Sequence, residues 1–382
     1  MRTGRREFLV SMAGFLACSL LRPTFAFSAG SSRIPRRAIG VNCMDLFYGP
    51  LIHDTSARPA EVRMRELGLA GIPFVRFAAS PFWPNEWRKY YADRQRYFSH
   101  FDAVVKAAET HKIGLVPSLF WNPVTISDLV GEPVSDWGKQ YSRTRDFMAG
   151  YVKEIVGRYH SSSAIWMWEF GNEFNTYANL PNSLKWWPKV NAERGTPAIR
   201  SKRDLITAAE CREAFRHFGL EVRKIDQMNF ISNGADLPRF DAYNLAHGKS
   251  QKDTAGELRA GLTDIVPDPI NALSIHLYQK SEGRYFPNSS SSYTEILSEV
   301  ASAAKGANKL SFVGEFGVPR MTDKAKEKRE YERMLKAIAA SGINLAALWV
   351  FDFQHQKDEW SVQFGGDRAY QLDAVSKINS EL

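Results

Sequence analysis

Short apolar runs recur along the chain, and helix-like stretches separate them. The apolar runs, which we interpret as strands, are 38–42, 74–77, 114–119, 165–170, 229–232, 272–276, 311–315 and 346–351. The helix-like stretches include 60–70, 101–111, 143–159, 207–225, 293–304 and 324–340. Near-continuous apolar strands that alternate with helices predict a parallel sheet covered by helices.

The number of these units predicts how the sheet is closed. Strand and helix alternate eight times, which favours a single (β/α)8 TIM barrel of the α/β class over an open, doubly wound sheet. An open sheet is expected to carry a Gly-rich phosphate-binding turn after its first strand, and the Gly-Val-Asn-Cys sequence at 40–43 is not such a turn. Two connections, 174–205 after strand 4 and 234–269 after strand 5, are longer than a barrel requires. Because both leave the C-terminal strand ends, where barrel active sites lie, we expect them to shape a substrate cleft.

The length and composition agree with one globular catalytic domain. The chain has 382 residues, with 44% hydrophobic and 24% charged residues, and we assign 29–382 to a single barrel domain. Aromatic residues make up 13% of the chain. Most of them are expected in the core, but Trp and Tyr also suit a sugar-binding cleft, because each has a flat apolar face and a polar edge.

The N-terminal segment has the features of an export signal. The pair Arg5-Arg6 stands directly before an apolar run that continues to Leu21, and this pattern resembles a twin-arginine signal. The run is too short to span a bilayer, so we predict a signal peptide over 1–28 and no stable membrane insertion after its cleavage. Lipidation at Cys18 is the alternative, but it fits poorly because Phe15 stands three residues earlier. The expected location is periplasmic or secreted.

The formal net charge of +8 does not indicate a nucleic-acid site. Basic clusters such as 324–329 are interleaved with acidic residues, which is typical of a solvated helix face, so no nucleic-acid partner is predicted. Cys43 and Cys211 could pair in an oxidising compartment, but we expect two free, buried thiols.

The sequence also does not indicate a metal centre. The pairs His53 with Asp54 and His355 with Asp358 lack the spacing of metal ligands, so we predict no metal and no cofactor.

Two glutamates lie at predicted C-terminal strand ends, where the active site of a barrel is found. Strand 4 runs apolar and then ends in Asn172-Glu173, and strand 7 ends in Glu315. Side chains at the C-terminal end of a barrel strand point into the site rather than into packing. Three βα units separate the two glutamates, which predicts that they face each other across one mouth. Glu169, within strand 4, is interpreted as a buried, hydrogen-bonded residue.

This arrangement resembles glycoside hydrolase family 5, the cellulase- and β-mannanase-like family of clan A, over 39–353. In that family an acid/base Glu ends strand 4 after Asn, and a nucleophilic Glu ends strand 7. The other family landmarks are an Arg on strand 2, a His and an aromatic residue on strand 6, and a Trp on strand 8. They are matched in order by Arg76, His276, Tyr278 and Trp349. Many members carry a His near the end of strand 3, where this sequence has Trp121-Asn122.

The resemblance implies a role for each matched residue. Glu173 is the expected acid/base and Glu315 the nucleophile of a retaining mechanism. Arg76 and Tyr278 are expected to contact Glu315, and Asn172 to bind the 2-hydroxyl of the sugar. Trp349 is expected to lie under the ring that is cleaved. We expect the aromatic surroundings of Glu173 to raise its pKa, with His276, Trp121 and Asn122 as further substrate-binding or supporting residues.

The expected activity is that of an O-glycosyl hydrolase on a carbohydrate. An endo-β-glycanase, such as a β-mannanase or an endoglucanase, is preferred because no second domain is predicted to close the cleft. Two alternatives remain open at this point: a transglycosidase, and a catalytically silent carbohydrate-binding barrel. The sugar, the linkage and the oligomeric state are not specified by the sequence.

Overall fold

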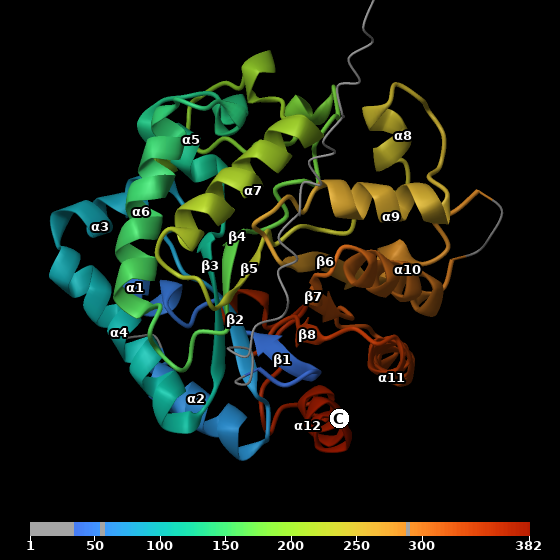
Figure 1. Ribbon diagram of the computed structural model, residues 1–382. Helices are drawn as coiled ribbons and strands as arrows, with labels where there is room; N and C mark the ends of the chain where they lie inside the picture. The colour runs from blue at the N-terminus through green and yellow to red at the C-terminus, as the bar shows by residue number, and fades with distance from the viewer. Residues whose placement is uncertain (1–33, 54–57, 288–290) are drawn as a thin grey trace, which may run out of the picture.

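A computed structural model describes residues 34–53, 58–287 and 291–382 (Figure 1). The predicted signal peptide at 1–28, with its arginine pair and Cys18, lies outside the described residues. Among the helices of the described part, none is long and apolar enough to cross a membrane.

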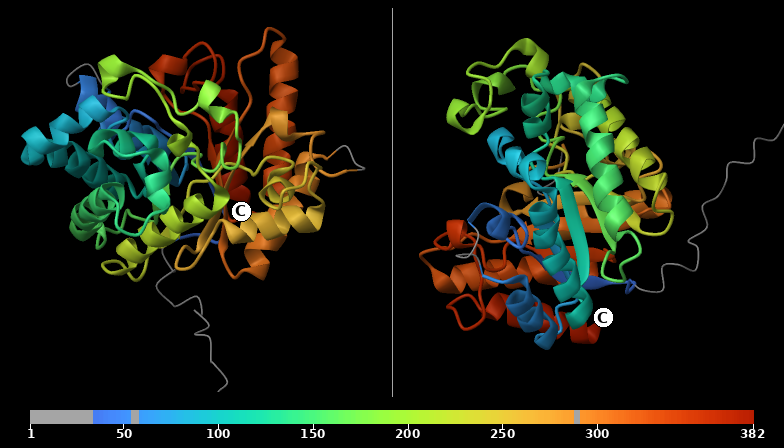
Figure 2. Two further views of the ribbon diagram at one scale, coloured as in Figure 1. Left: turned by 90° about the horizontal axis from the view of Figure 1, so that it is seen from above. Right: turned by 90° about the vertical axis from the view of Figure 1, so that its left-hand side faces the viewer.

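Eight parallel strands form a closed barrel in chain order, and β1 pairs with β8 to close it. Figures 1 and 2 show the strands at the centre and the helices around them. The strands are β1 Ala38–Asn42, β2 Phe74–Ala78, β3 Gly114–Phe120, β4 Met167–Gly171, β5 Phe230–Ser232, β6 Ala272–Tyr278, β7 Leu310–Gly317 and β8 Leu345–Leu348. The predicted (β/α)8 TIM barrel is confirmed.

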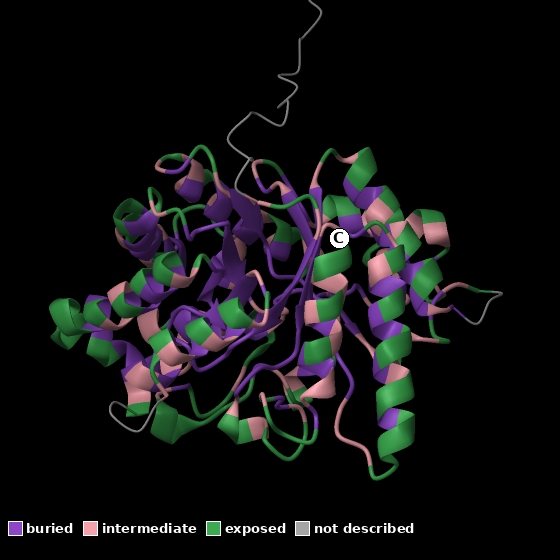
Figure 3. Ribbon diagram, turned by 90° about the horizontal axis from the view of Figure 1, so that it is seen from below, coloured by how far each residue is buried: buried purple, intermediate pink, exposed green. Residues whose placement is uncertain are grey.

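The helices are α1 Tyr48–His53, α2 Ala60–Leu69, α3 Arg88–Ala92, α4 Arg94–His111, α5 Val124–Val130, α6 Arg143–Tyr159, α7 Ala208–Arg223, α8 Ala242–Ala246, α9 Ala255–Asp264, α10 Tyr293–Gly306, α11 Lys324–Ala340 and α12 Tyr370–Glu381. Short 3-10 helices lie at η3 Pro84–Trp87, η4 Val134–Gly138, η5 Ser183–Lys185, η6 Ala192–Arg194, η7 Lys202–Asp204, η8 Gln279–Ser281 and η9 Gln354–Gln356. Figure 3 shows that buried residues lie on the strands and along one side of the surrounding helices, as amphipathic helices require.

The two long connections differ in structure. The connection after β4 holds only the 3-10 helices η5, η6 and η7 before α7 begins. The connection after β5 is long, as predicted, but it is not free of regular structure, because it holds α8 and α9. Gly256 and Gly261 weaken the apolar pattern of α9. Its start is nevertheless signalled by a capping box, in which the Thr254 side chain accepts from the Glu257 backbone.

The start of β4 and the end of β8 differ from the predicted bounds, because the hydrogen-bonded pairing of these strands is shorter than the apolar runs. β4 begins at Met167 and β8 ends at Leu348, because Ile165 and Phe351 form only isolated bridges. Phe351 pairs with Val362 instead of continuing the barrel. Trp349 therefore stands just beyond the strand end, at the mouth.

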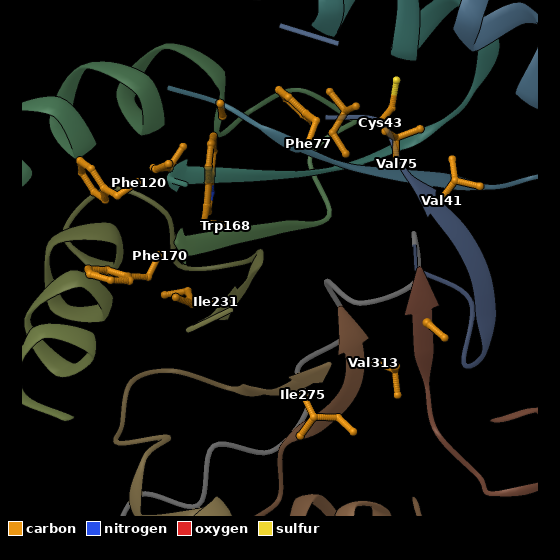
Figure 4. Packing of buried hydrophobic residues seen from close by; sticks show 14 of the residues in the cluster. Val41, Cys43, Val75, Phe77, Phe120, Trp168, Phe170, Ile231, Ile275 and Val313 are labelled. Atoms are coloured by element: carbon orange, nitrogen blue, oxygen red, sulfur yellow. The ribbon is translucent and has the colours of Figure 1, made fainter. Parts of the chain in front are cut away.

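Alternate residues along each strand fill two different layers. Phe74 points into the barrel, where it packs against Trp166 and Phe312 with ring centroids 5.6 and 6.3 Å away. Figure 4 shows outward-facing residues of the other layer, among them Val75 and Phe77 of the same strand. Arg76 lies two residues after Phe74, so it shares the inward face at the next level towards the mouth. The barrel interior is thus apolar at its N-terminal end and polar at its C-terminal end.

The prediction of two free, buried thiols is confirmed. Neither Cys43 nor Cys211 forms a disulfide, and both are buried. Burial raises the pKa of each thiol, which keeps both in the neutral form.

Candidate active site

Glu173 occupies a tight turn beyond the end of β4. Its φ is 52°, in the left-handed region, and its backbone N–H donates to Gly234 O at 2.9 Å. A Cβ at Gly234 would lie 1.8 Å from Gly171 O, so only glycine lets the segment after β5 come this close to β4. A non-glycine residue in this backbone region costs energy that the surroundings must offset. The turn leaves the Glu173 side chain 32% exposed, facing the cleft.

Glu315 is placed by an irregularity between β6 and β7. Ile275 is paired with Val313, but the next pair is His276 with Glu315, so Gly314 is an extra residue in the ladder. A bulge of this kind re-aims the side chain that follows it. A Cβ at Gly314 would lie 3.0 Å from His276 Nε2. The Glu315 side chain is only 5% exposed, so its contacts are with other protein groups.

Arg76 connects these groups from the floor of the mouth. It is fully buried. Nε donates to Glu169 Oε1, Nη1 donates to both Glu315 Oε1 and Asn42 Oδ1, and Nη2 donates to Asn172 Oδ1, all within 2.8 to 3.0 Å. Burial disfavours the charged form of Arg76. The Glu169 and Glu315 carboxylates outweigh burial, and the pKa of Arg76 is raised. The prediction that Glu169 is a buried, hydrogen-bonded residue is confirmed.

Two side chains of β6 bring the glutamates together. Tyr278 Oη donates to Glu315 Oε2 at 2.5 Å. His276 Nδ1 lies 2.8 Å from Glu173 Oε1 and 3.5 Å from Glu315 Oε2. One nitrogen atom is therefore in reach of both carboxylates, which places them side by side across a narrow gap.

The pKa of Glu173 is opposite in direction to the sequence expectation. Burial does favour its neutral form, but the hydrogen bond and charge of His276 outweigh burial and lower the pKa of Glu173. Burial disfavours the charged form of His276, yet Glu315 and Glu173 raise its pKa above the ordinary value. The contact between the two side chains thus favours the charged form of each. The aromatic surroundings do not decide this equilibrium, because one imidazole at 2.8 Å contributes more than burial.

A third carboxyl, Asp236, was not identified from the sequence. Its ligand atom and those of Glu173 and His276 all lie within 4.8 Å of one another. Burial, followed by the charge of Glu173, raises the pKa of Asp236 to about 7. Within this cluster, Glu173 Oε1 is hydrogen bonded to His276 Nδ1. The absence of a cofactor stays a prediction.

Asn42 is a second residue that sequence reasoning missed. Besides accepting from Arg76, it donates from Nδ2 to Gly314 O at 2.9 Å. It therefore holds both Arg76 and the backbone next to Glu315. Its position as the last residue of β1, with a polar side chain at a strand end, is the signal that could have identified it.

A hollow of about 210 Å³ opens beside Glu173 and Asn172. The predicted residues Trp121 and Asn122 line it, together with Trp83, Tyr177 and Trp187. Tyr177 and Trp187 stack with centroids 4.8 Å apart, which gives the long connection after β4 an aromatic face. A larger hollow of about 400 Å³ lies between α7, α8 and α9, and none of the predicted site residues lines it.

Trp121 and Trp349 form the inner wall of the mouth. Their rings are stacked, with centroids 5.9 Å apart, and the Arg76 guanidinium lies 4.6 Å from the Trp121 centroid. Trp349 Nε1 donates to Gln356 Oε1 at 2.9 Å, which fixes its ring. Trp121 is only 6% exposed, so it covers Arg76 more than it offers a surface for stacking.

Comparison with known proteins gives a family and a set of structural neighbours. The family model described as cellulase (glycosyl hydrolase family 5) matches residues 52–354. No curated protein matches the sequence.

Solved structures share the fold at low identity. An endo-1,4-β-D-mannanase from Thermotoga petrophila RKU-1 has a TM-score of 0.65 at 14% identity, over 91% of this chain and 100% of that one. A family 5 mannosidase from Rhizomucor miehei has a TM-score of 0.59 at 11% identity, over 91% and 94%. An endoglucanase from Pseudomonas stutzeri has a TM-score of 0.55 at 14% identity, over 90% and 93%.

Proposed function

Because the chain belongs to glycosyl hydrolase family 5, we propose that its barrel is a retaining β-glycosidase that acts on a β-mannan or β-glucan by double displacement. The observation that carries the proposal is the contact of His276 Nδ1 with both Glu173 and Glu315. Retaining enzymes hold their two carboxyl groups about 5 to 5.5 Å apart, whereas inverting enzymes leave room for a water between them. A gap that one nitrogen atom spans favours the retaining arrangement.

In the first step, a Glu315 oxygen attacks the anomeric carbon while Glu173 gives its proton to the glycosidic oxygen. The bond from the anomeric carbon to that oxygen breaks, and an ester bond to Glu315 forms. Glu173 receives its proton from His276 Nδ1 along the hydrogen bond between them. Arg76 and Tyr278 each donate to one oxygen of Glu315, which orients the carboxylate for attack.

In the second step, Glu173 acts as the base. It takes a proton from water, the water oxygen attacks the anomeric carbon, and the bond to Glu315 breaks. Asn172 Oδ1 already accepts from Arg76 Nη2, so Nδ2 is the group that this amide offers to the 2-hydroxyl of the sugar. That contact strengthens in the transition state of both steps.

The substrate proposal is supported by the cleft and by the neighbours. The aromatic lining at Trp83, Tyr177 and Trp187 suits stacking on pyranose rings. The structural neighbours include an endo-mannanase, a mannosidase and an endoglucanase. We prefer endo action on a polymer, with the linkage to be found by experiment.

Hydrolysis of a panel of defined β-manno- and β-gluco-oligosaccharides, with product anomers followed by NMR, tests the proposal. We expect turnover with retention, loss of activity in Glu315→Ala, and wild-type activity in Glu332→Ala, an exposed control on α11. Inversion, or turnover that survives Glu315→Ala, contradicts the mechanism. Binding without turnover indicates the silent carbohydrate-binding barrel, and glycosyl transfer to an added acceptor indicates the transglycosidase.

We also propose that the protein is exported. The support is the pair Arg5-Arg6 before the apolar run that ends at Leu21. A polymeric β-glycan is too large to enter a cell intact, so an exported enzyme agrees with the proposed substrate.

A further inference from the structure

Asp236 lies in the connection after β5, and its backbone is fixed next to the acid/base Glu173. Its N–H donates to Asn175 Oδ1, and Asn175 Nδ2 donates to Asp236 O, both at 2.9 Å. Asn175 is itself buried and stands two residues after Glu173. This reciprocal pair joins the connections after β4 and β5. It therefore sets the distance between the two carboxyl groups.

The Asp236 carboxyl is buried without a cation of its own. It is 7% exposed, and Thr176 Oγ1 lies 3.4 Å from its Oδ2. Among the residues that the structure describes, no Lys or Arg forms an ion pair with it. Its ligand atom instead lies within 4.8 Å of those of Glu173 and His276. A buried acid in such a place costs stability, which indicates a functional reason for keeping it.

The groups that act on Asp236 come from the elements around the mouth. They include acids, bases and phenols: Glu173, Tyr177, His276, Tyr278, Lys280, Tyr285 and Glu315. Burial and the charge of Glu173 raise the pKa of Asp236, while His276 and Lys280 oppose them. The strongest opposing charge is therefore that of His276, which also contacts Glu173.

We infer that Asp236 is a positioning residue for Glu173: together with His276 it forms a three-member cluster in which the two carboxyl groups and the imidazole share a proton. The inference rests on the proposed function and deepens it, because it assigns a pH range to the acid step. Two carboxyl groups this close do not readily ionise together, so they titrate as a pair. The pair therefore keeps one proton after the other is lost, and an ionised Asp236 disfavours the Glu173 carboxylate, so that the remaining proton is available to Glu173.

The sign of the effect follows from this charge. Asp236→Asn removes a negative charge that opposes ionisation of Glu173, whereas the positive charge of His276 remains. Glu173 then loses its proton at lower pH, and the alkaline limb of kcat/KM moves down by about one pH unit. A leaving group that departs as a stable anion does not need a proton from Glu173. With such a substrate, the alkaline limb of kcat/KM is therefore expected to stay in place in Asp236→Asn.

The test compares pH profiles of kcat/KM for phenyl and 2,4-dinitrophenyl β-mannosides, or the β-glucosides if the wild type prefers them. We expect Asp236→Asn to shift the alkaline limb with the phenyl glycoside only. Asp264→Asn, which removes the same charge from the exposed end of α9, is expected to match the wild type. Asp236→Glu keeps a carboxylate and is expected to restore most of the wild-type limb.

The outcomes separate this inference from the proposed function. An active wild type, an inactive Glu315→Ala and an unchanged limb in Asp236→Asn overturn the role of Asp236 and leave the proposed function standing. The same shift in Asp236→Glu as in Asp236→Asn also overturns it, because packing rather than charge would then be responsible. A wild type that turns over no β-glycoside overturns both.

Discussion

Arg76 Nη1 donates to Glu315 Oε1 at 2.8 Å, and no part of the Arg76 side chain is exposed to solvent. The same guanidinium reaches Glu169, Asn42 and Asn172, so one side chain from β2 fixes polar groups from β1, β4 and β7. A planar group with five N–H donors suits this task, because its hydrogen bonds have fixed directions. The position of Glu315 relative to Asn172 is therefore set by Arg76.

Arg76→Lys keeps the charge but cannot reproduce these directions. We expect the free energy of unfolding to fall by about 1–3 kcal/mol, since buried acceptors lose their donors. We expect kcat/KM to fall about 100-fold because Glu315 is misplaced. Chemical denaturation and steady-state kinetics measure both. Arg158→Lys is the control, because Arg158 pairs with Asp102 on the exposed surface, where about 0.5 kcal/mol or less is expected. Wild-type kcat/KM in Arg76→Lys would show that Glu315 does not need the guanidinium.

Asp236→Asn is expected to stabilise the protein, and more so at high pH. The pKa of Asp236 is raised to about 7 in the folded protein, whereas that of an unfolded Asp is about 4. The folded state binds more protons between these values, so the stability that depends on Asp236 is lost as pH rises through this range. The gain in the variant should reach up to roughly 4 kcal/mol at about pH 8 and be much smaller near pH 4.5.

Urea denaturation at the two pH values measures this difference, with Asp264→Asn as the control. Asp264 is on the exposed end of α9, so its variant should change by about 0.5 kcal/mol or less at both values. An equal gain at both pH values in Asp236→Asn would argue against a proton held on Asp236.

The parts of the site that follow strand periodicity were predictable. Arg76 lies on the same face as Phe74, and Asn172 follows β4 directly, so a strand assignment correct within two residues places them at the mouth. The parallel order of the barrel then brings the end of β4 and the end of β7 together. The prediction that Glu173 and Glu315 face each other across one mouth was possible for this reason.

The residues that were missed depend on the path of a connection. Asp236 reaches Glu173 only because Gly234 allows the chain after β5 to turn against Gly171, and no periodic pattern records that turn. The prediction that the pKa of Glu173 is raised was wrong for a related reason. Many aromatic neighbours suggested burial, but a single contact with His276 Nδ1 determines the direction. Helix α9 was not predicted, because its two glycines weaken the helical spacing of apolar residues in this segment.

Replacing both Arg5 and Arg6 by Lys is expected to block export, since the arginine pair is the recognised feature of a twin-arginine signal. Cell fractionation should then show an uncleaved precursor inside the cell. The wild type should be found outside the cytoplasm, with a mature N-terminus near residue 29. A matched variant with Lys at positions 2 and 22 keeps the pair and should be exported. Equal export of both variants would remove the support for a twin-arginine route.

Gly314→Ala tests whether the contact of His276 with the glutamates is needed. An added Cβ would lie 3.0 Å from His276 Nε2 and 3.1 Å from Ser274 Oγ, so the imidazole must shift. That shift lengthens the 2.8 Å contact between Nδ1 and Glu173 Oε1, and we expect kcat/KM to fall about 10-fold or more. Gly150→Ala in α6 is the matched control, because a Cβ there meets nothing within 4 Å. Its activity should be unchanged and its stability higher by up to about 1 kcal/mol. Full activity in both variants would show that Glu173 obtains its proton without His276.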